Sequence, residues 1–193
     1  DLLQALACDY ISTKFKSFSD LTVIDFGGDK GQHEIIFNYH LKSRNYNLSW
    51  NIIEEAGWIA KHQIHPKLIT PNLGHDNYIR REFKQSDLST AGIMNFNTKW
   101  YSNITFLPFK EADIVIMGSS LQYTGPNWKE CLRNLSKFQP HFMFIMNAPI
   151  CDQKTLVLEN NDLRGGDILA TTTNGWVFID YNEFVKYVEF LGY

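Results

Sequence analysis

A short buried strand that runs directly into closely spaced glycines constrains this sequence more than any other feature. In the stretch LTVIDFGGDKGQHEII, residues 21–36, an apolar run ends in an aspartate and three glycines, and a helix-like pattern follows. Because glycine has no Cβ atom, such a turn allows the backbone to approach a bound molecule closely. The stretch predicts a nucleotide-binding turn, although an ordinary glycine-rich turn between a strand and a helix is the simpler interpretation.

Short apolar runs alternate with amphipathic stretches along the chain, which is typical of a parallel sheet covered by helices. We therefore predict an open, mostly parallel, doubly wound α/β sheet within a single domain, residues 1–193. Strands are expected within 21–26, 48–55, 103–107, 112–123, 141–150 and 155–159, and helices near 2–15, 32–43, 57–63, 127–138 and 181–191. The first helix is indicated by apolar residues at helical spacing, namely Leu2, Leu3, Leu6 and Tyr10. Between residues 65 and 102 the pattern fades, so we interpret that segment as an insertion or cap.

Composition sets limits on the function. With 193 residues, of which 44% are apolar, the chain can bury one substantial core. A formal charge of −3 offers no broad basic surface, so we do not expect nucleic acid as a partner. Cys8, Cys131 and Cys151 lie far apart, which argues against a disulfide framework or a Cys-x-x-Cys metal pair and favours a reducing, cytoplasmic location. No apolar run approaches the length that spans a bilayer.

The glycine turn itself carries a more specific pattern. DFGGDKG follows the order acidic-x-Gly-x-Gly-x-Gly at Asp25, Gly27 and Gly31, while Asp29 takes the place of the second glycine and Gly28 stands one place earlier. This turn resembles that of the class I S-adenosyl-L-methionine (SAM)-dependent methyltransferases. The resemblance implies that Gly27, Gly28 and Gly31 make room for the methionine part of SAM. It also implies that Asp25 and Asp29 lie near the ammonium group of SAM or organise the turn.

An acidic residue follows the second expected strand. In WNIIEE, Glu54 is the first polar residue after the apolar run, and Glu55 is the competing choice. In doubly wound sheets an acidic residue at this place can bind the ribose of a nucleotide. A carboxylate suits a diol because it accepts two O–H donors side by side. We therefore predict that Glu54 binds the ribose hydroxyls.

Small polar residues follow the fourth expected strand. In ADIVIMGSSLQY, the side chains of Ser119, Ser120 and Gln122 would line the crevice at the carboxyl ends of the strands. The resemblance to methyltransferases implies that Ser119 and Gln122 bound the sulfonium side of SAM.

Four stretches taken together narrow the resemblance. IDFGGDKG, WNIIEE, DIVIMGSSLQYTGP and NAPI…GW…EF…LGY resemble a family of bacterial methyltransferases whose relatives often lie among cell-surface polysaccharide genes. The resemblance runs from Val23 onward and is thin across 65–102. It implies methyl transfer from SAM to a small-molecule or sugar-type acceptor, such as a glycan precursor, by in-line displacement and without a metal. For a hydroxyl or amine acceptor a general base would help, with His33, Tyr123 and Asp152 as candidates.

Two other functions stay open at this point. The chain could bind SAM or a nucleotide without turnover, since Asp29 replaces a glycine of the usual turn and no base stands out. An NAD-dependent doubly wound enzyme would place Glu54 on the adenosine ribose, but the sequence lacks Gly-x-Gly-x-x-Gly. The oligomeric state is left open.

The two ends of the sequence suggest a fragment. The chain begins without methionine and stops at FLGY, before the antiparallel hairpin that usually closes such a sheet. We therefore expect that hairpin to be missing, with an exposed strand edge as the result.

Overall fold

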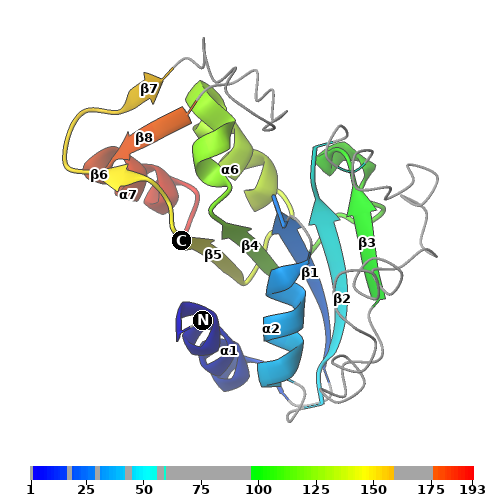
Figure 1. Cartoon of the computed structure of the whole chain (residues 1–193). Coiled ribbons are helices and arrows are strands. Elements are labelled where there is room, and N and C mark those ends of the chain that lie inside the picture. Colours follow the sequence, from blue (N-terminus) through cyan, green and yellow to red (C-terminus); the bar gives the residue numbers. More distant parts are fainter. Residues whose placement is uncertain are drawn as a thin grey trace.

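The computed structural model describes residues 2–16, 19–28, 31–41, 45–55, 59, 97–158 and 176–193. Five parallel strands form one sheet in the order β3-β2-β1-β4-β5 (Figure 1). The strands are β1 (Asp20–Phe26), β2 (Asn47–Ile53), β3 (Asn97–Tyr101), β4 (Ile114–Gly118) and β5 (Phe142–Met146). The chain runs outward from β1 to β3 and then returns to β4 on the other side of β1. The predicted open, doubly wound α/β sheet is confirmed.

Helices cover both faces of the sheet. The helices α1 (Leu2–Lys14) and α2 (Gln32–Leu41) pack on one face, and α6 (Trp128–Ser136) packs on the other (Figure 1). Each face of the sheet has its own hydrophobic core. Val23 of β1 packs in the core under α1 and α2, and its neighbour Ile24 packs in the core under α6. A parallel strand that is buried on both faces needs apolar side chains on both, which is why β1 and β4 are recognisable as continuous apolar runs.

A smaller sheet follows β5. Its central strand, β8 (Trp176–Asp180), is parallel to β6 (Ile150–Cys151) and antiparallel to β7 (Leu156–Leu158). The helix α7 (Tyr181–Phe190) follows directly. Val177 and Ile179 of β8 are buried in the same core as Trp128 of α6. The smaller sheet is therefore attached to the α6 side of the main sheet.

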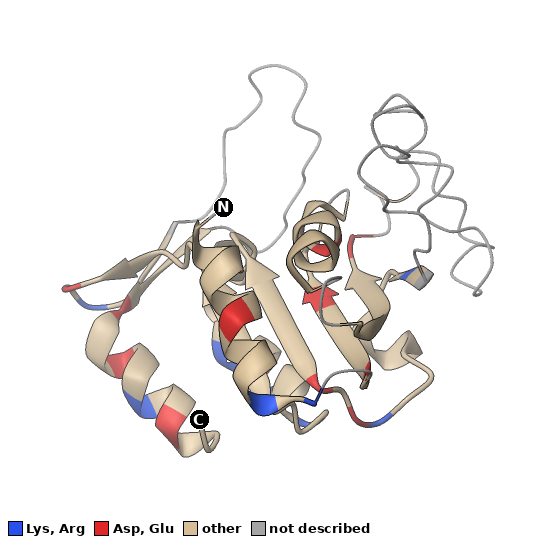
Figure 2. Cartoon of the chain, turned by 90° about the horizontal axis from the view of Figure 1, so that it is seen from below, with Lys and Arg blue, Asp and Glu red and all other residues tan. Residues whose placement is uncertain are grey.

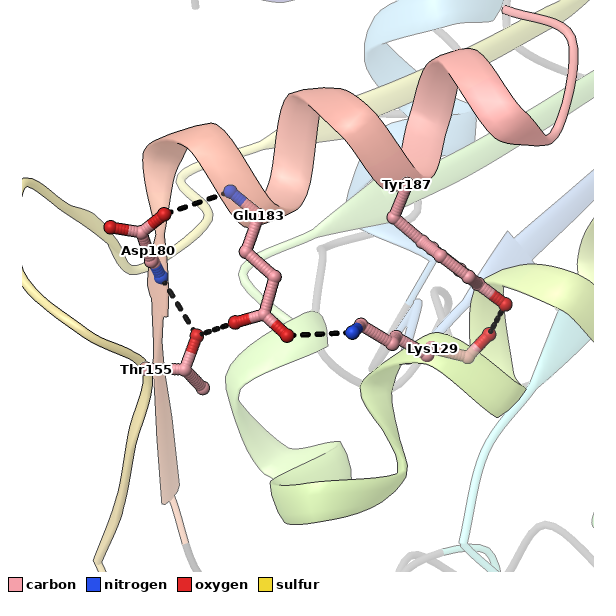
Figure 3. Close-up of polar contacts among 5 residues, drawn as sticks. All are labelled: Lys129, Thr155, Asp180, Glu183 and Tyr187. Atoms are coloured by element: carbon pink, nitrogen blue, oxygen red, sulfur yellow. Dashed lines mark hydrogen bonds and ion pairs between the residues drawn. The ribbon is translucent and has the colours of Figure 1, made fainter.

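A polar network fastens α7 to α6 (Figure 3). The Glu183 carboxylate forms an ion pair with Lys129 Nζ at 2.6 Å and accepts a hydrogen bond from the Thr155 hydroxyl. The Asp180 N–H donates to Thr155 Oγ1 at 3.0 Å, and the Asp180 carboxylate caps α7 by accepting the Glu183 N–H at 2.8 Å. The Tyr187 hydroxyl donates to the Lys129 carbonyl oxygen at 2.9 Å. These contacts join the residue before β7, the end of β8 and both helices.

The third strand lies elsewhere than the sequence analysis predicted. Residues expected to be extended form a short 3-10 helix, η3 (Ile104–Phe106), which the Asn103 side chain caps. The strand is β3, in which Thr98 and Trp100 are buried and alternate with a less buried residue. A search for continuous apolar runs misses this two-residue period. β3 lies inside the segment 65–102 that was interpreted as an insertion or cap, while residues 65–96 fall outside the described part.

Other expected elements differ in detail. The strand β7 and the helix α7 are confirmed, whereas β8 was not predicted. The first helix is present, but the stripe that indicated it is exposed: Leu2, Leu3, Leu6 and Tyr10. The residues that α1 buries instead are Gln4, Ala7, Cys8 and Ile11. The short helix expected at 57–63 lies almost wholly outside the described residues.

Along the ribbon of the described residues, Lys and Arg positions are interspersed with Asp and Glu positions (Figure 2). Within the described segments, no helix combines the length and the apolar character that crossing a membrane requires. Among the described strands, β5 pairs only with β4.

Candidate functional site

The candidate site lies where the strand order reverses. The carboxyl ends of β1 and β4 are neighbours at this point, and the 3-10 segment η4 (Leu121–Asn127) follows β4. Ligands of open α/β sheets bind in the crevice outside the strand ends at such a point. The Gly27 N–H donates to the Ile53 carbonyl oxygen at 2.8 Å, which joins the end of β1 to the end of β2. Three strand ends therefore meet at one edge.

The glycines of the turn give space to protein side chains. Gly27 has a φ of +67°, and a Cβ atom there would lie 2.4 Å from Ser120 Cβ. A Cβ atom at Gly28 would lie 2.6 Å from Asp25 Cγ. Gly31, with a φ of +75°, donates its N–H to the Gly28 carbonyl oxygen at 2.9 Å. Side chains would clash at two of these positions and strain the backbone at two, so the turn requires glycine even without a ligand.

Asp25 lies under this turn with no exposed surface. His33 Nδ1 lies 3.0 Å from Asp25 Oδ1 and 3.3 Å from Oδ2, and Trp50 Nε1 donates to Oδ2 at 3.1 Å. Both carboxylate oxygens therefore have protein partners. These contacts join the end of β1 to α2 and to β2.

His33 is the second residue of α2, and its ring reaches the end of β4. A Cβ atom at Gly118 would lie 2.1 Å from His33 Cε1 and 2.2 Å from Nε2. The Cε1–Nε2 edge of the ring therefore rests against the last residue of β4, and only glycine leaves room for it. The His33 side chain is 16% exposed. The ring thus lies at the switch point of the sheet, which is the place where the strand order reverses. An imidazole there can exchange a proton with a bound molecule.

Two side chains after β4 carry buried polar atoms that have no partner among the described residues. These atoms are Ser120 Oγ and Gln122 Oε1, on residues that are 6% and 7% exposed. A buried polar group without a hydrogen bond costs about 1–3 kcal/mol. Groups of this kind beside a glycine turn are suited to a ligand that supplies the missing donors.

Ser119 lies next to them in a left-handed conformation, with a φ of 56°. Its N–H donates to the Met146 carbonyl oxygen at 2.9 Å, and its hydroxyl accepts a hydrogen bond from Asn147 Nδ2 at 3.2 Å. These bonds tie the loop after β4 to the end of β5. Ser119 is thus held at the same edge as the glycine turn.

Glu54 stands directly after β2. Its N–H donates to the Tyr101 carbonyl oxygen at 3.0 Å, and its carboxylate accepts the Glu55 N–H through Oε1 at 2.9 Å. Glu54 is half-buried, whereas Glu55 is exposed. Because Gly27 bonds to the residue before Glu54, the backbone of Glu54 and the glycine turn are neighbours.

The two other candidate bases, Tyr123 and Asp152, have exposed side chains. The Tyr123 side chain is 40% exposed, and its ring meets the Trp176 ring of β8 edge to face at 5.1 Å. Asp152 is exposed in the bend after β6. Asp29 falls outside the described residues. Within the described part of the chain, no cluster of His, Cys, Asp or Glu could hold a metal ion.

Sequence reasoning missed two parts of the site. It did not connect His33 with Asp25 and Trp50, and it overlooked Asn147. The available signal was polarity in unexpected places: an aspartate at the end of an apolar strand, and an asparagine after another. Without the register of the strands, these residues could not be paired.

Comparison with known proteins shows the fold. No protein-family model matches the sequence, and no curated protein matches it. PigF with SAH matches 100% of this chain and 49% of its own, at 12% identity and a TM-score of 0.51. Precorrin-6y C5,15-methyltransferase from Geobacter metallireducens matches 98% and 70%, at 13% identity and a TM-score of 0.44. The [4+2]-cyclase SpnF matches 97% and 56%, at 12% identity and a TM-score of 0.48.

These identities are low, and the likeness to PigF is a likeness of fold alone. Together with the strand order, it shows a Rossmann-like α/β fold. The chain spans about half the length of the first solved structures that it resembles.

Proposed function

We propose that this chain is the SAM-binding part of a methyltransferase that acts on a small-molecule acceptor. The observation that carries the proposal is a pair of buried oxygens, Ser120 Oγ and Gln122 Oε1, that have no partner among the described residues and lie beside a glycine turn at the switch point. A ligand with several hydrogen-bond donors would satisfy them. The ammonium group and ribose hydroxyls of SAM are such donors. The presence of SAH in the PigF structure is consistent with this choice.

We assign the residues at the three strand ends to different parts of SAM. Gly27, Gly28 and Gly31 keep the backbone close to the methionine part, with Asp29 contributing at the turn. Glu54 releases the Glu55 N–H and accepts the ribose hydroxyls, for which its carboxylate is suited. This assignment fits the position of Glu54 beside the turn.

The loop after β4 borders the reacting end. Ser119 and Gln122 bound the sulfonium side of SAM, and Ser120 Oγ and Gln122 Oε1 accept hydrogen bonds from its ammonium group. SAM supplies an activated methyl group, so the chain has to align the acceptor with it and exclude water. His33 serves as the general base for a hydroxyl or amine acceptor.

The surface next to η4 suggests the kind of acceptor. Tyr123 and Trp176 expose neighbouring aromatic rings that come from η4 and β8. Aromatic faces bind rings with apolar faces, which include sugars and aromatic compounds. We propose an acceptor of this shape, in keeping with the small-molecule or sugar-type acceptor expected from the sequence.

Isothermal titration with SAM, SAH and NAD tests the cofactor. We expect SAM and SAH to bind with a Kd of about 1–100 μM and NAD not to bind. Glu54→Ala should weaken SAM binding about tenfold or more, because two charge-assisted hydrogen bonds are lost. The matched control is Glu55→Ala, which removes an exposed carboxylate one residue away and should bind SAM as the wild type does.

The other functions have distinct outcomes in the same experiment. Binding of NAD without SAM would identify a dinucleotide enzyme instead. SAM binding without turnover across a panel of glycosides, phenols and amines would identify a binding module. Equal effects of Glu54→Ala and Glu55→Ala would contradict the proposed ribose contact.

A further inference from the structure

Protein partners occupy both oxygens of the Asp25 carboxylate. Oδ1 lies 3.0 Å from His33 Nδ1, and Oδ2 accepts the Trp50 indole N–H at 3.1 Å. The carboxylate also fills the space where Gly28 has no Cβ atom. Asp25 has no exposed surface, so its carboxylate is not open to the crevice. Its surroundings therefore suit a role toward His33 better than the cofactor contact that the sequence resemblance implied.

We infer that Asp25, together with Trp50, is a positioning residue that holds His33 in the tautomer with hydrogen on Nδ1, and that His33 takes the proton of the methyl acceptor. The proton transfer rests on the methyltransferase function proposed above, whereas the tautomer does not. An ionised carboxylate only accepts hydrogen bonds, so Nδ1 donates to Asp25. Nε2 is then the nitrogen that carries the lone pair.

The location of the ring suits this role. Nε2 lies on the edge of the ring that rests against Gly118, the last residue of β4. The loop with Ser119, Ser120 and Gln122 begins at the next residue. Nε2 therefore lies at the switch point, whereas Nδ1 lies under the glycine turn and faces Asp25.

These groups account for every bond, electron pair and proton in the transfer step. The acceptor oxygen forms a bond to the methyl carbon, the bond between that carbon and sulfur breaks, and its electron pair stays on sulfur. The acceptor proton passes to His33 Nε2, and the ring becomes an imidazolium ion. The Asp25 carboxylate stabilises that charge through the Nδ1 contact.

Trp50 makes one substitution especially informative. The indole N–H can only donate, so the amide oxygen of the Asp25→Asn side chain should face Trp50 and its NH2 group should face His33. An NH2 donor requires Nδ1 to accept, which moves the ring hydrogen to Nε2. The same exchange at the aspartate of a serine-protease triad lowers kcat about 10⁴-fold with the geometry intact.

The first experiment observes the tautomer by ¹⁵N NMR of the histidine ring nitrogens in the full chain without ligand. His33→Gln identifies the signals of His33. We expect hydrogen on Nδ1 in the wild type, hydrogen on Nε2 in Asp25→Asn, and both forms in the double variant Asp25→Asn/Trp50→Phe. Hydrogen on Nε2 in the wild type would overturn the inference.

Asp113→Asn is the matched control for that experiment. Asp113 accepts the Thr22 N–H at 2.7 Å at the amino ends of β1 and β4, far along the strands from His33. The control changes a carboxylate to an amide in the same sheet and should leave the His33 tautomer unchanged. A changed tautomer in Asp113→Asn would show that the NMR signal reports general loosening rather than the Asp25 contact.

The second experiment separates binding from transfer, with SAM and the acceptor that gives the highest turnover in the panel above. Asp25→Asn and His33→Gln should each lower kcat about 100-fold or more, while the Kd for SAH changes less than about threefold. A rise in Kd as large as the loss of transfer would make His33 a cofactor contact and overturn its role as base. If the wild type binds no SAM, the proposed function fails, and the NMR result still decides whether Asp25 positions His33.

Discussion

At the residue scale, Gln122 is an example of a site residue that lowers the stability of the folded chain. Its buried amide oxygen has no partner among the described residues. We predict that Gln122→Met, which keeps the length and removes the polar group, stabilises the ligand-free chain by about 1 kcal/mol. This corresponds to a rise in Tm of about 2–4 °C for a chain of this size. SAM binding should weaken about tenfold in titration, because the ligand loses its acceptor.

A second buried glutamine provides the control. Gln4 of α1 also carries an unpartnered buried oxygen among the described residues, but it lies in the core under the other face of the sheet. Gln4→Met should raise Tm by a similar amount and leave the Kd for SAM unchanged. If both variants bind SAM like the wild type, Gln122 is only an imperfectly satisfied core residue.

At the scale of elements, the network around Glu183 decides how firmly the smaller sheet is held. The pKa of Glu183 lies below its usual value of 4.5, chiefly because of the hydrogen bond from Lys129 and then that from Thr155. The folded chain therefore keeps this carboxylate ionised at a pH where the unfolded chain has bound a proton. The resulting stability is complete above about pH 4.5 and is lost as the pH falls through the lower folded pKa.

We predict that Glu183→Gln lowers the free energy of unfolding by about 0.5–1 kcal/mol near pH 7, since the ion pair is partly exposed. The difference from the wild type should shrink as the pH falls below 4.5. Urea unfolding at several pH values measures it. Glu189→Gln on the same helix, where the side chain is exposed, is the control, and an equal loss in both variants would show that helix charge rather than the network matters.

The elements also differ in how far the sequence reveals them. Strands buried on both faces, such as β1 and β4, are visible as continuous apolar runs. Strand β8 buries only alternate residues and was not predicted, and β3 buries Thr98, Trp100 and Tyr101 but not Lys99. For α1, the local spacing of leucines indicated a helix correctly but not its packed face, because Ala7, Cys8 and Ile11 are the residues that pack into the core shared with α2.

At the scale of the whole molecule, topology explains which parts of the site were predictable. Carboxyl ends of parallel strands meet at one edge, so the glycine turn, Glu54 and the loop from Ser119 to Gln122 could be grouped from sequence alone. The contact of Asp25 with Trp50 depends on the register of β1 against β2, in which Asp25 pairs with Ile52. The contact of His33 with Gly118 depends on the amino end of α2 reaching the last residue of β4. Neither contact can be predicted from the spacing of residues along the sequence.

The central claim is that SAM binds at the carboxyl ends of β1, β2 and β4. A crystal structure of the chain with SAH tests it most directly. We predict that the ligand lies between Glu54 and Gln122, with the ribose hydroxyls on the Glu54 carboxylate, a hydrogen bond to Gln122 Oε1, and the bond between Asp25 and His33 intact. SAH bound elsewhere, or a Glu54 carboxylate still on the Glu55 N–H beside bound ligand, would contradict the account.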